Sequence, residues 1–373
     1  MKVALVVPGF SSSEQDWCIP ALLNYVRALA RQAEAHVFTL RWPERGGMYP
    51  VFGATVHALD GRKQLGGHVF HLWARALRAI AAEHRRAPFD VIHAFWADEP
   101  GWVAALASKW LNIRLLLSLA GGELVGMPDI GYGLQLLPGR KQLMRLSLQQ
   151  ATRVTAGSEY LCGLARSACE PRKIVRAPLG VDTALFSPPE AERPAVEVIV
   201  NVGSLYPVKD QRRLICAFRQ VVGQMPQAQL HIVGGGPLMG DLRALADGLP
   251  IRFLGEMDHA KLPEVYRGAA VFAQTSRHEA QGMAMLEAAA CGLPVVGTSV
   301  GLLPEIGVVA RDETELAWAL VEMLRDPARR KSAGQAARRK VEAEFALAPT
   351  VERFRRLYQA MPHGGAERGP NSV

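Results

Sequence analysis

Two glutamates, Glu279 and Glu287, are the residues whose type and spacing point most directly to chemistry. Seven residues separate them, so Glu279 falls just before a predicted helix and Glu287 about two turns into it. Carboxylates accept hydrogen bonds from vicinal sugar hydroxyls, and the free backbone N–H groups at a helix start bind phosphate. The pattern suits a ligand that carries a phosphate between two sugars. The alternative is that both glutamates are solvated residues on a helix surface.

The elements that must position these glutamates form one strand–helix–strand unit. The sequence predicts a buried strand at residues 271–274, a polar corner at 275–281 and a helix of small residues at 282–290. A Cys-Gly stop follows, and then a second strand at 294–297. This is the order of a βαβ unit, and its polar corner carries the candidate chemistry.

The residues around the two glutamates resemble a known family. The run S-R-H-E-A-Q-G-M-x-x-L-E-A-x-A-C-G-x-P-V-V, at 276–296, resembles the E-x7-E signature of the retaining glycosyltransferase family 4, whose members have two facing Rossmann-like domains of the GT-B type. The resemblance implies that Glu279 lies by the donor sugar and diphosphate, and Glu287 by the nucleoside ribose. The family often has Gly-Phe-Gly after the first glutamate, whereas this chain has Ala280 and Gln281 before the glycine. The resemblance also assigns substrate contacts to other residues of the run: Arg277, His278, Gly282 and Met283.

A strand is predicted at 198–202. The segment that follows it, GSLYPVK at residues 203–209, resembles the family's G-R-L-x-P-x-K, in which arginine and lysine clamp the donor diphosphate. Gly203 and Lys209 match this pattern, and Ser204 replaces the arginine. A lysine beside a helix start makes an anion site, so we assign Lys209 a catalytic role together with Glu279. Two alternatives stay open: Lys209 is an ordinary surface lysine, or the missing arginine is replaced by another one, Arg213 or Arg277.

A glycine cluster follows the next predicted strand. Gly236 and Pro237 close the run GGGP, which matches the family's G-x-G-P turn by the nucleotide. We therefore add both residues to the substrate-binding set. The resemblance is strong over residues 196–307 and weak before residue 170, so it informs the donor side more than the acceptor side.

The first half of the chain alternates predicted strands and helices. A loop rich in Gly, Pro and Arg is expected to run through Tyr49. The order predicts an α/β fold with a parallel sheet, whose ligand-binding loops follow the strands. The strands are expected at 2–7, 36–40, 54–59, 91–94 and 113–119, and the helices at 16–32, 68–86 and 100–111.

A chain of 373 residues exceeds what one hydrophobic core usually organises, so two domains are expected. The G-V-D-x-x-x-F-x-P run at 180–188 resembles the family's crossover between its domains. The expected division is a GT-B pair of Rossmann-like domains facing each other across a cleft. Its parts are an acceptor-side domain at 1–177, a linker at 178–195, a nucleotide-sugar-binding domain at 196–345, a helix packing back on the first domain at 346–362 and a disordered tail at 363–373.

The acceptor side departs from the family. Family members commonly have T-x-H-G after the fifth strand, and alignment of S-L-A-G-G-E places Ala120 where that histidine is expected. Glu123, nearby in the same loop, is a candidate substrate-binding residue. His93, at the end of its own predicted strand, either faces the same site or is a core residue.

Composition excludes several classes of function. Five scattered cysteines lack metal-ligand spacing, and neither a G-x-G-x-x-G nor a G-x-x-x-x-G-K-[ST] motif is present. Without a D-x-D motif to hold a divalent ion, we expect no metal and no cofactor other than the donor substrate. A net charge of +8 is compatible with an acidic ligand or an anionic membrane, and no nucleic-acid-binding motif is present. We expect a cytoplasmic protein, with peripheral contact to the inner face of a membrane as a hypothesis.

The resemblance, together with the lack of a D-x-D motif, implies a retaining, metal-independent glycosyltransferase that moves a hexose from a nucleotide-diphosphate sugar to a glycan, lipid or small-molecule acceptor. The alternative is a non-catalytic partner subunit that binds a nucleotide-sugar but has lost turnover, together with the histidine that Ala120 replaces. The membrane hypothesis rests on the helix at 68–86 and the basic run near residue 140. The alternative for that helix is that its apolar residues face the sheet and its arginines are solvated. The residues concerned are Phe70, Leu72, Trp73, Leu77, Ile80, Arg75, Arg78, Arg85, Arg86, Arg140, Lys141 and Arg145.

Overall fold

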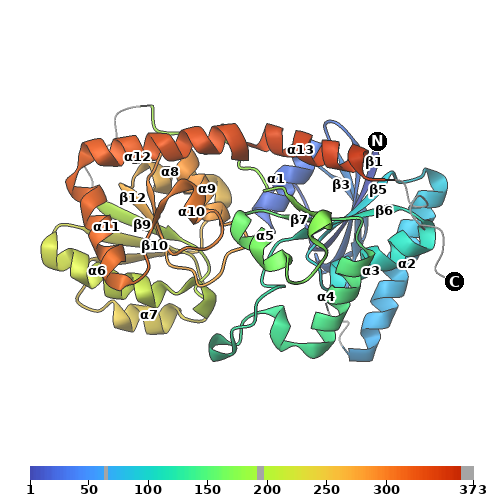
Figure 1. Ribbon diagram of the computed structural model, residues 1–373, viewed down its shortest axis with the longest axis horizontal. Helices are drawn as coiled ribbons and strands as arrows, with labels where there is room; N and C mark the ends of the chain where they lie inside the picture. Colours follow the sequence, from blue (N-terminus) through green and yellow to red (C-terminus); the bar gives the residue numbers. More distant parts are fainter. Residues whose placement is uncertain (63–65, 191–196, 363–373) are drawn as a thin grey trace. The chain divides into compact units, whose positions relative to one another are not determined.

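The chain folds into two compact α/β units. Unit 1 comprises Met1–Leu179 and Thr350–Val373, and unit 2 comprises Gly180–Pro349 (Figure 1). The first division falls inside the expected linker at 178–195, and the expected tail at 363–373 lies outside the described residues. The computed structural model describes residues 1–62, 66–190 and 197–362.

Unit 1 contains an eight-stranded sheet in the order β3-β4-β2-β1-β5-β6-β7-β8. Neighbouring strands are parallel except β3 and β4, which are antiparallel. The strands are β1 (Lys2–Gly9), β2 (Glu34–Trp42), β3 (Gly46–Val51), β4 (Ala54–Leu59), β5 (Val91–Phe95), β6 (Arg114–Leu119), β7 (Arg153–Ala156) and β8 (Ile174–Arg176).

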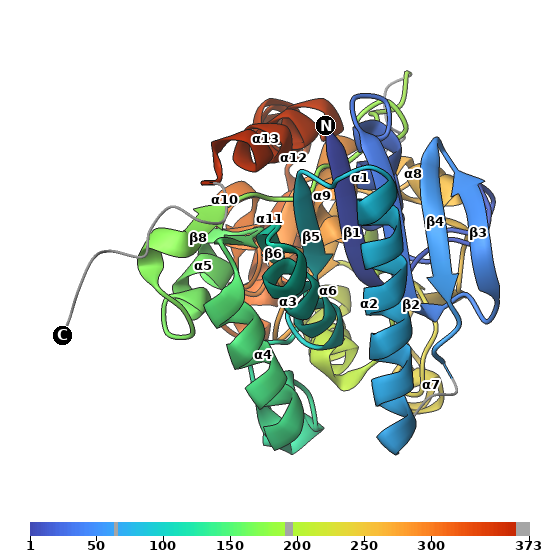
Figure 2. The same ribbon diagram turned by 90° about the vertical axis from the view of Figure 1, so that its right-hand side faces the viewer.

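Helices cover both faces of this sheet. Strand β1 is apolar along its length because Val3 and Leu5 face one layer of helices while Ala4 and Val6 face the other. Helices α2, α3 and α4 lie over one face, as Figure 2 shows, and α1 and α13 pack in the core on the other. The helices are α1 (Pro20–Leu29), α2 (Val69–Arg86), α3 (Glu99–Leu111), α4 (Pro138–Gln150), α5 (Glu159–Ala165) and α13 (Leu347–Ala360).

The expectation of a loop through Tyr49 is wrong, because β3 occupies that segment. The strand carries Gly46, Gly47 and Pro50, and Met48 is 63% exposed. It lies at the edge of the sheet and pairs on one side only, so it needs neither a full set of hydrogen bonds nor an apolar run. Those two features are what sequence patterns detect.

The core of unit 1 contains a buried chain of polar side chains. His93 lies in β5 with Nδ1 2.7 Å from the hydroxyl of Tyr358 in α13 and Nε2 2.7 Å from Oγ of Ser118 in β6. The hydroxyl of Tyr358 is in turn 2.5 Å from that of Tyr25 in α1. His93 and both tyrosines are fully buried. This chain joins the last helix to the central strands, and burial lowers the pKa of His93 to about 3.

Unit 2 contains a six-stranded parallel sheet in the order β11-β10-β9-β12-β13-β14. The sequence predicted the bounds of β9 and β12 correctly and missed the two-residue β14. The strands are β9 (Val198–Val202), β10 (Gln229–Val233), β11 (Ile251–Gly255), β12 (Val271–Gln274), β13 (Val295–Gly297) and β14 (Val308–Val309).

Two layers of helices cover the sheet of unit 2. One core joins α6, α7 and α11 to the sheet, and the other joins α8, α9, α12 and a π-helical turn, Val341–Phe345. The helices are α6 (Gln211–Gln224), α7 (Met239–Leu245), α8 (Leu262–Arg267), α9 (Met283–Ala290), α10 (Leu303–Ile306), α11 (Glu313–Arg325) and α12 (Pro327–Lys340).

The strand order of unit 2 reverses between β9 and β12. From β9 the chain proceeds through α6 to β10 on one side, and it later returns through α8 to β12 on the other side. Open parallel sheets bind ligands beyond the carboxyl ends of the strands at such a switch point. A ligand-binding site is therefore expected in the loops after β9 and β12.

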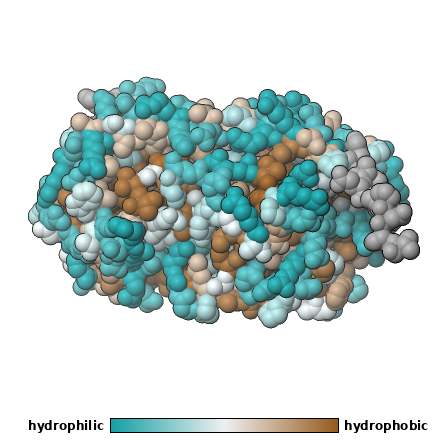
Figure 3. Space-filling view, in the orientation of Figure 1, coloured by the Kyte–Doolittle hydropathy of each residue, from teal (hydrophilic) through white to brown (hydrophobic). Residues whose placement is uncertain are grey.

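Within the described residues, no helix has both the length and the apolarity that crossing a bilayer requires. The face of the molecule in Figure 3 agrees with this: it is largely hydrophilic, and its hydrophobic patches are separated by polar residues.

Candidate functional site

Lys209 and Glu279 meet at the switch point of unit 2. Lys209 ends the loop between β9 and α6, and Glu279 lies between β12 and α9. The lysine Nζ is 2.5 Å from Oε1 of Glu279, and the hydroxyl of Ser276 donates to the same oxygen at 2.7 Å. The two predicted catalytic residues are thus an ion pair, and both retain solvent exposure, 28% for the lysine side chain and 14% for the glutamate.

A small cavity of about 40 Å³ lies beside this pair. Lys209 and Glu279 are the charged side chains in its lining. Three buried amides also line it: Asn201 at the end of β9, Gln274 at the end of β12 and Gln211 at the start of α6. Asn201 Oδ1, Gln211 Oε1 and Gln274 Nε2 have no hydrogen-bond partner among the residues that the structure describes. Buried polar atoms of this kind bind ordered water or a polar ligand group, so the cavity is a polar site.

Helix α9 begins at this cavity without a side-chain cap. Its N-cap is Gly282, which has a φ of 94° and no side chain to cap the helix. The first N–H groups of an uncapped helix attract anions. Gly282, Met283 and Gly203, all predicted from the sequence, line the cavity together with Lys209 and Glu279. A phosphate bound here would meet Lys209 and the start of α9 together.

The glycine turn after β10 packs against the loop after β9. Leu205 N donates to Gly235 O at 2.7 Å, and Gly203 N donates to Val233 O at 3.0 Å. A Cβ on Gly236 would lie 2.6 Å from Leu205 O, and its φ of 151° is itself a glycine conformation. The predicted Gly236 therefore holds two loops of the site in close approach, while Pro237 follows it exposed on the surface.

Glu287 lies further along α9 and is 6% exposed. Its Oε1 is 2.7 Å from Nε2 of His259, and its Oε2 accepts from the hydroxyl of Tyr266 at 3.2 Å. Burial, followed by the nearby Glu287, raises the pKa of Tyr266 well above its usual value, so the phenol stays protonated and donates. The predicted ribose-binding glutamate is held by two side chains.

Two other predicted residues flank Glu279 without lining the cavity. Arg277 N donates to Val208 O at 2.8 Å, which fixes the corner against the lysine loop, and His278 is buried at 2% exposure. Arg213, offered as a substitute for the missing arginine, directs its guanidinium to Arg311 O at 2.5 Å and lines a separate cavity. Lys209 is therefore the cation of the cavity lining.

Glu123 lies in a second cavity of about 270 Å³, in unit 1. Its carboxylate accepts from the backbone N–H groups of Ala120 at 3.1 Å and Gly121 at 2.6 Å, and burial raises its pKa. Asp98, Trp96 and other residues of the loops after β5 and β6 complete the lining: Gly122, Gly131, Tyr132, Gly133, Leu134, Leu136 and Leu137. This cavity also lies at the carboxyl ends of the strands.

His93 does not reach this second cavity. It lies inside β5 at 0% exposure, bound to Tyr358 and Ser118, so the core alternative holds for it. Ala120 is partly exposed after β6, and its backbone N–H contacts Glu123.

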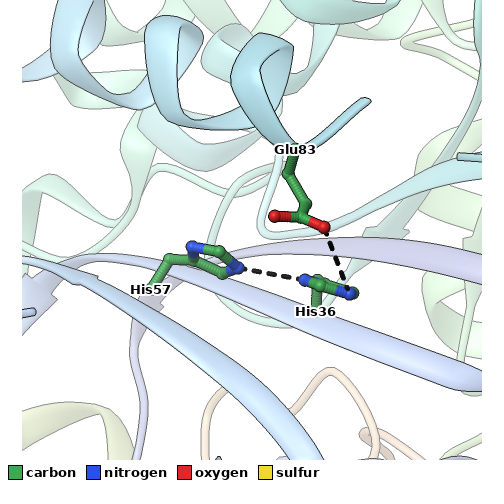
Figure 4. A group of neighbouring side chains, drawn as sticks. All are labelled: His36, His57 and Glu83. Carbon is green, nitrogen blue, oxygen red and sulfur yellow. Dashed lines mark hydrogen bonds and ion pairs between the residues drawn. The ribbon is translucent and has the colours of Figure 1, made fainter. Parts of the chain in front are cut away.

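The described residues include one group with the donor set of a metal site, His36, His57 and Glu83. Figure 4 shows His36 between the other two, with its Nδ1 3.0 Å from Nε2 of His57 and its Nε2 4.0 Å from Glu83. Lys2 Nζ lies 2.8 Å from the same carboxylate, and Glu34 is 2.9 Å from His36 Nε2. The carboxylate of Glu83 thus already has a cationic partner, and the group joins β1, β2, β4 and α2 as an ion-pair network.

Sequence reasoning missed the three amides and His259. The available signal for Asn201 and Gln274 was a polar residue near the carboxyl end of an otherwise apolar strand, VIVNV and VFAQ. His259 stands in a polar loop with no pattern of its own. Only the fold brings it to Glu287.

The comparisons with known proteins agree with this geometry. Residues 21–185 match the model of "Glycosyltransferase Family 4", and residues 196–326 match that of "Glycosyl transferases group 1". The chain is 33% identical over 258 residues to the GDP-mannose-dependent monoacylated alpha-(1-6)-phosphatidylinositol monomannoside mannosyltransferase of Corynebacterium glutamicum, across 62% of this chain and 68% of that protein. It is 28% identical over 334 residues to the D-inositol 3-phosphate glycosyltransferase of Kineococcus radiotolerans, across 77% and 75%.

Solved structures show the same fold. Sucrose-phosphate synthase from Thermosynechococcus elongatus superposes with a TM-score of 0.76 at 21% identity, over 96% of this chain and 98% of that one. HepE of Anabaena in complex with UDP-glucose gives 0.74 at 18% identity, over 96% and 100%. The two α/β units are therefore those of the GT-B fold, and the chain belongs to glycosyltransferase family 4.

Proposed function

We propose that this protein is a retaining, metal-independent glycosyltransferase that moves a hexose from a nucleotide-diphosphate sugar to an acceptor hydroxyl. The observation that carries the proposal is the Lys209–Glu279 pair beside a polar cavity at the switch point of unit 2. A cation and a helix start stabilise the charge that develops on a leaving diphosphate. A carboxylate beside them can accept hydrogen bonds from the sugar.

The names of similar proteins support the class of donor. The relative from Corynebacterium glutamicum is GDP-mannose-dependent, and HepE of Anabaena was solved with UDP-glucose. Both ligands are nucleotide-diphosphate hexoses, with a ribose that Glu287 would bind. The two ligands differ in base and in sugar, so we propose the class of nucleotide-diphosphate hexoses and not one particular donor.

Retention of configuration is proposed because the chain belongs to a family described as retaining, and a front-face route is compatible with Ala120 in place of the usual histidine. In a front-face route, the bond between the anomeric carbon and the phosphate oxygen breaks, and the bond to the acceptor oxygen forms on the same face. The acceptor proton passes to the leaving phosphate, so no histidine is required. Glu123 already accepts backbone hydrogen bonds and is assigned to shaping the acceptor cavity.

A lipid-linked or membrane-assembled acceptor suits the surface around the second cavity. Leu136 and Leu137 line that cavity at 37% and 49% exposure, and Arg140 follows them at the start of α4. The apolar face expected on α2 is divided, however: Leu72 and Ile80 are buried against the sheet, while Phe70 is 64% exposed. We propose peripheral contact with anionic lipid through the exposed apolar and basic residues at the starts of α2 and α4.

The test of the proposed function is product formation. The purified protein is incubated with a panel of UDP- and GDP-hexoses and with glycan, phosphoinositide and small polyol acceptors, and products are identified by mass spectrometry, with the anomeric configuration read by NMR. Transfer with retention supports the proposal, and transfer with inversion contradicts it. Donor binding without transfer to any acceptor would favour the alternative of a non-catalytic partner subunit, which rests on Ala120 alone.

A further inference from the structure

Two side chains outside α9 contact the carboxylate of Glu287. His259 begins a short 3-10 helix, His259–Lys261, and Tyr266 lies in α8. They contact different oxygens of Glu287, at 2.7 Å for His259 and 3.2 Å for Tyr266. The side chains of His259 and Glu287 are each 8% exposed, and Tyr266 is fully buried. The pairing is therefore a feature of the interior and not a surface contact.

The direction of these hydrogen bonds follows from the chemistry of the groups. A carboxylate accepts and does not donate, so Nε2 of His259 carries the proton in this contact, and the phenol of Tyr266 donates to the other oxygen. A carboxylate offers roughly four acceptor positions, two on each oxygen. One position on each oxygen of Glu287 is taken, and one on each remains.

The imidazole of His259 is itself held in place. The fully buried ring of Phe186 packs edge-on against it, with ring centroids 5.1 Å apart and an interplanar angle of 66°. Rotation of the imidazole is therefore restricted, and its Nε2 is directed at Glu287. A carboxylate fixed in this way presents its two remaining acceptor positions in one orientation.

We propose that His259 is a positioning residue that orients Glu287 to receive the two vicinal hydroxyls of a nucleoside ribose. The proposal deepens the proposed function and rests on it, because it names how the donor's ribose is selected. A fixed carboxylate loses less conformational freedom on binding than a mobile one. Its two free acceptor positions match a diol better than a single hydroxyl.

The test separates orientation of Glu287 from general support of the fold. His259→Phe removes the donor, and His259→Gln keeps an N–H in a similar position. Binding of UDP, GDP and their 2′,3′-dideoxy forms to the full-length protein and both variants is measured by calorimetry. His231→Gln, on β10 of the same unit, is the matched control.

We expect His259→Phe to weaken binding of the ribonucleotide by about tenfold. It should change binding of the dideoxy form by less than about twofold, and His259→Gln should restore most of the loss. Equal weakening of both forms would show that His259 only supports the fold, and an unchanged ribonucleotide affinity would also overturn the proposal. If His259→Phe does not fold, His259→Leu, which also removes the donor, takes its place: a loss confined to the ribonucleotide supports the proposal, and an equal loss for both forms overturns it.

Failure of the proposed function gives a different result. Wild-type protein that binds neither UDP nor GDP would overturn the function and the positioning role together. Wild-type protein that binds either nucleotide and loses affinity on Glu287→Gln but not on His259→Phe would overturn the positioning role alone.

Discussion

The ammonium of Lys209 lies 2.5 Å from Oε1 of Glu279, although the two are 70 positions apart in the chain. Each charge of the site is thus the partner of the other. A diphosphate that takes the lysine must leave Glu279 with a different partner, and the hydroxyl of Ser276, 2.7 Å from the same oxygen, remains available. In the proposed function, donor binding would therefore exchange the partner of each residue, and the two residues can be separated by experiment.

Replacement of the lysine should weaken donor binding. Lys209→Met removes the cation from the cavity lining, and a charge-assisted hydrogen bond contributes about 1.5–3 kcal/mol. We expect the Kd of UDP or GDP to rise about 10- to 100-fold by calorimetry. Lys261→Met is the control, because its side chain is 68% exposed and lies outside the lining. Equal effects of both changes would show that only net charge matters.

Replacement of the glutamate should separate binding from turnover. Glu279→Gln removes the anion that competes with the diphosphate for Lys209, so nucleotide affinity should stay equal or increase. The stabilisation of the reacting sugar is lost, and kcat should fall by about 10²–10³. Steady-state kinetics and calorimetry on the same preparation measure both quantities. A variant with normal kcat would remove Glu279 from the mechanism.

The parts of the fold that followed from the sequence are those whose strands are buried on both faces. β9 and β12 read as short apolar runs between polar or glycine residues, and their bounds were predicted correctly. β3 was missed because an exposed edge strand with Gly46, Gly47 and Pro50 carries no such run. Tertiary pairing with β4 alone makes it a strand.

Some residues of the candidate site could be predicted from the sequence and others could not. The residues of the E-x7-E run and Lys209 were predicted because their motifs resemble those of a known family, and each motif follows a predicted strand, where a parallel α/β sheet places its ligand-binding loops. His259 could not be predicted, because its role depends on the fold bringing residue 259 to within 2.7 Å of Glu287. Local patterns describe a single element, whereas this contact requires the 3-10 helix His259–Lys261 to lie against α9.

Catalysis should not require a divalent ion. Glu279 is the carboxylate in the lining of the cavity, and it is already paired with Lys209. We expect transfer rates to change less than about twofold after treatment with EDTA, since a cationic side chain and a helix start supply the charge stabilisation. Activity that disappears with EDTA and returns with magnesium or manganese would contradict this prediction.

The buried histidine of unit 1 should make folding sensitive to acid. Burial lowers the pKa of His93 to about 3 from 6.5, so the unfolded chain binds a proton below pH 6.5 that the folded chain does not. The contribution of His93 to the free energy of unfolding is complete above pH 6.5 and is lost as the pH falls towards 3. Between pH 7.5 and 5, the loss from His93 is about 2 kcal/mol.

Urea unfolding of wild type and His93→Gln between pH 7.5 and pH 5 measures the contribution of His93 to the free energy of unfolding. Glutamine keeps hydrogen-bonding groups for Tyr358 and Ser118 but does not titrate, and all other groups cancel between the two proteins. The free energy of unfolding of wild type, relative to that of His93→Gln, should fall by about 2 kcal/mol between pH 7.5 and pH 5. A pH-independent difference would mean that His93 is not buried in its neutral form.

Membrane contact is tested by flotation with liposomes. Arg140 and Arg145 are exposed on α4, beside the exposed Leu136 and Leu137. At ~1 kcal/mol per cation, Arg140→Gln with Arg145→Gln should reduce partitioning onto anionic vesicles about 30-fold. The pair Arg325→Gln with Arg339→Gln, in exposed positions of unit 2, is the control. Equal partitioning onto neutral and anionic vesicles, or none onto either, would remove the membrane proposal.

The last helix has a consequence for synthesis on the ribosome. Val351, Phe354 and Tyr358 of α13 complete the core against Tyr25 and the central strands of unit 1, although unit 2 is encoded between them. Unit 2 is a continuous segment and has all of its residues once residue 349 has emerged. Unit 1, begun first, keeps an apolar face uncovered until α13 has emerged. The second unit can therefore finish folding before the first, and a chain truncated before α13 should be captured by chaperones.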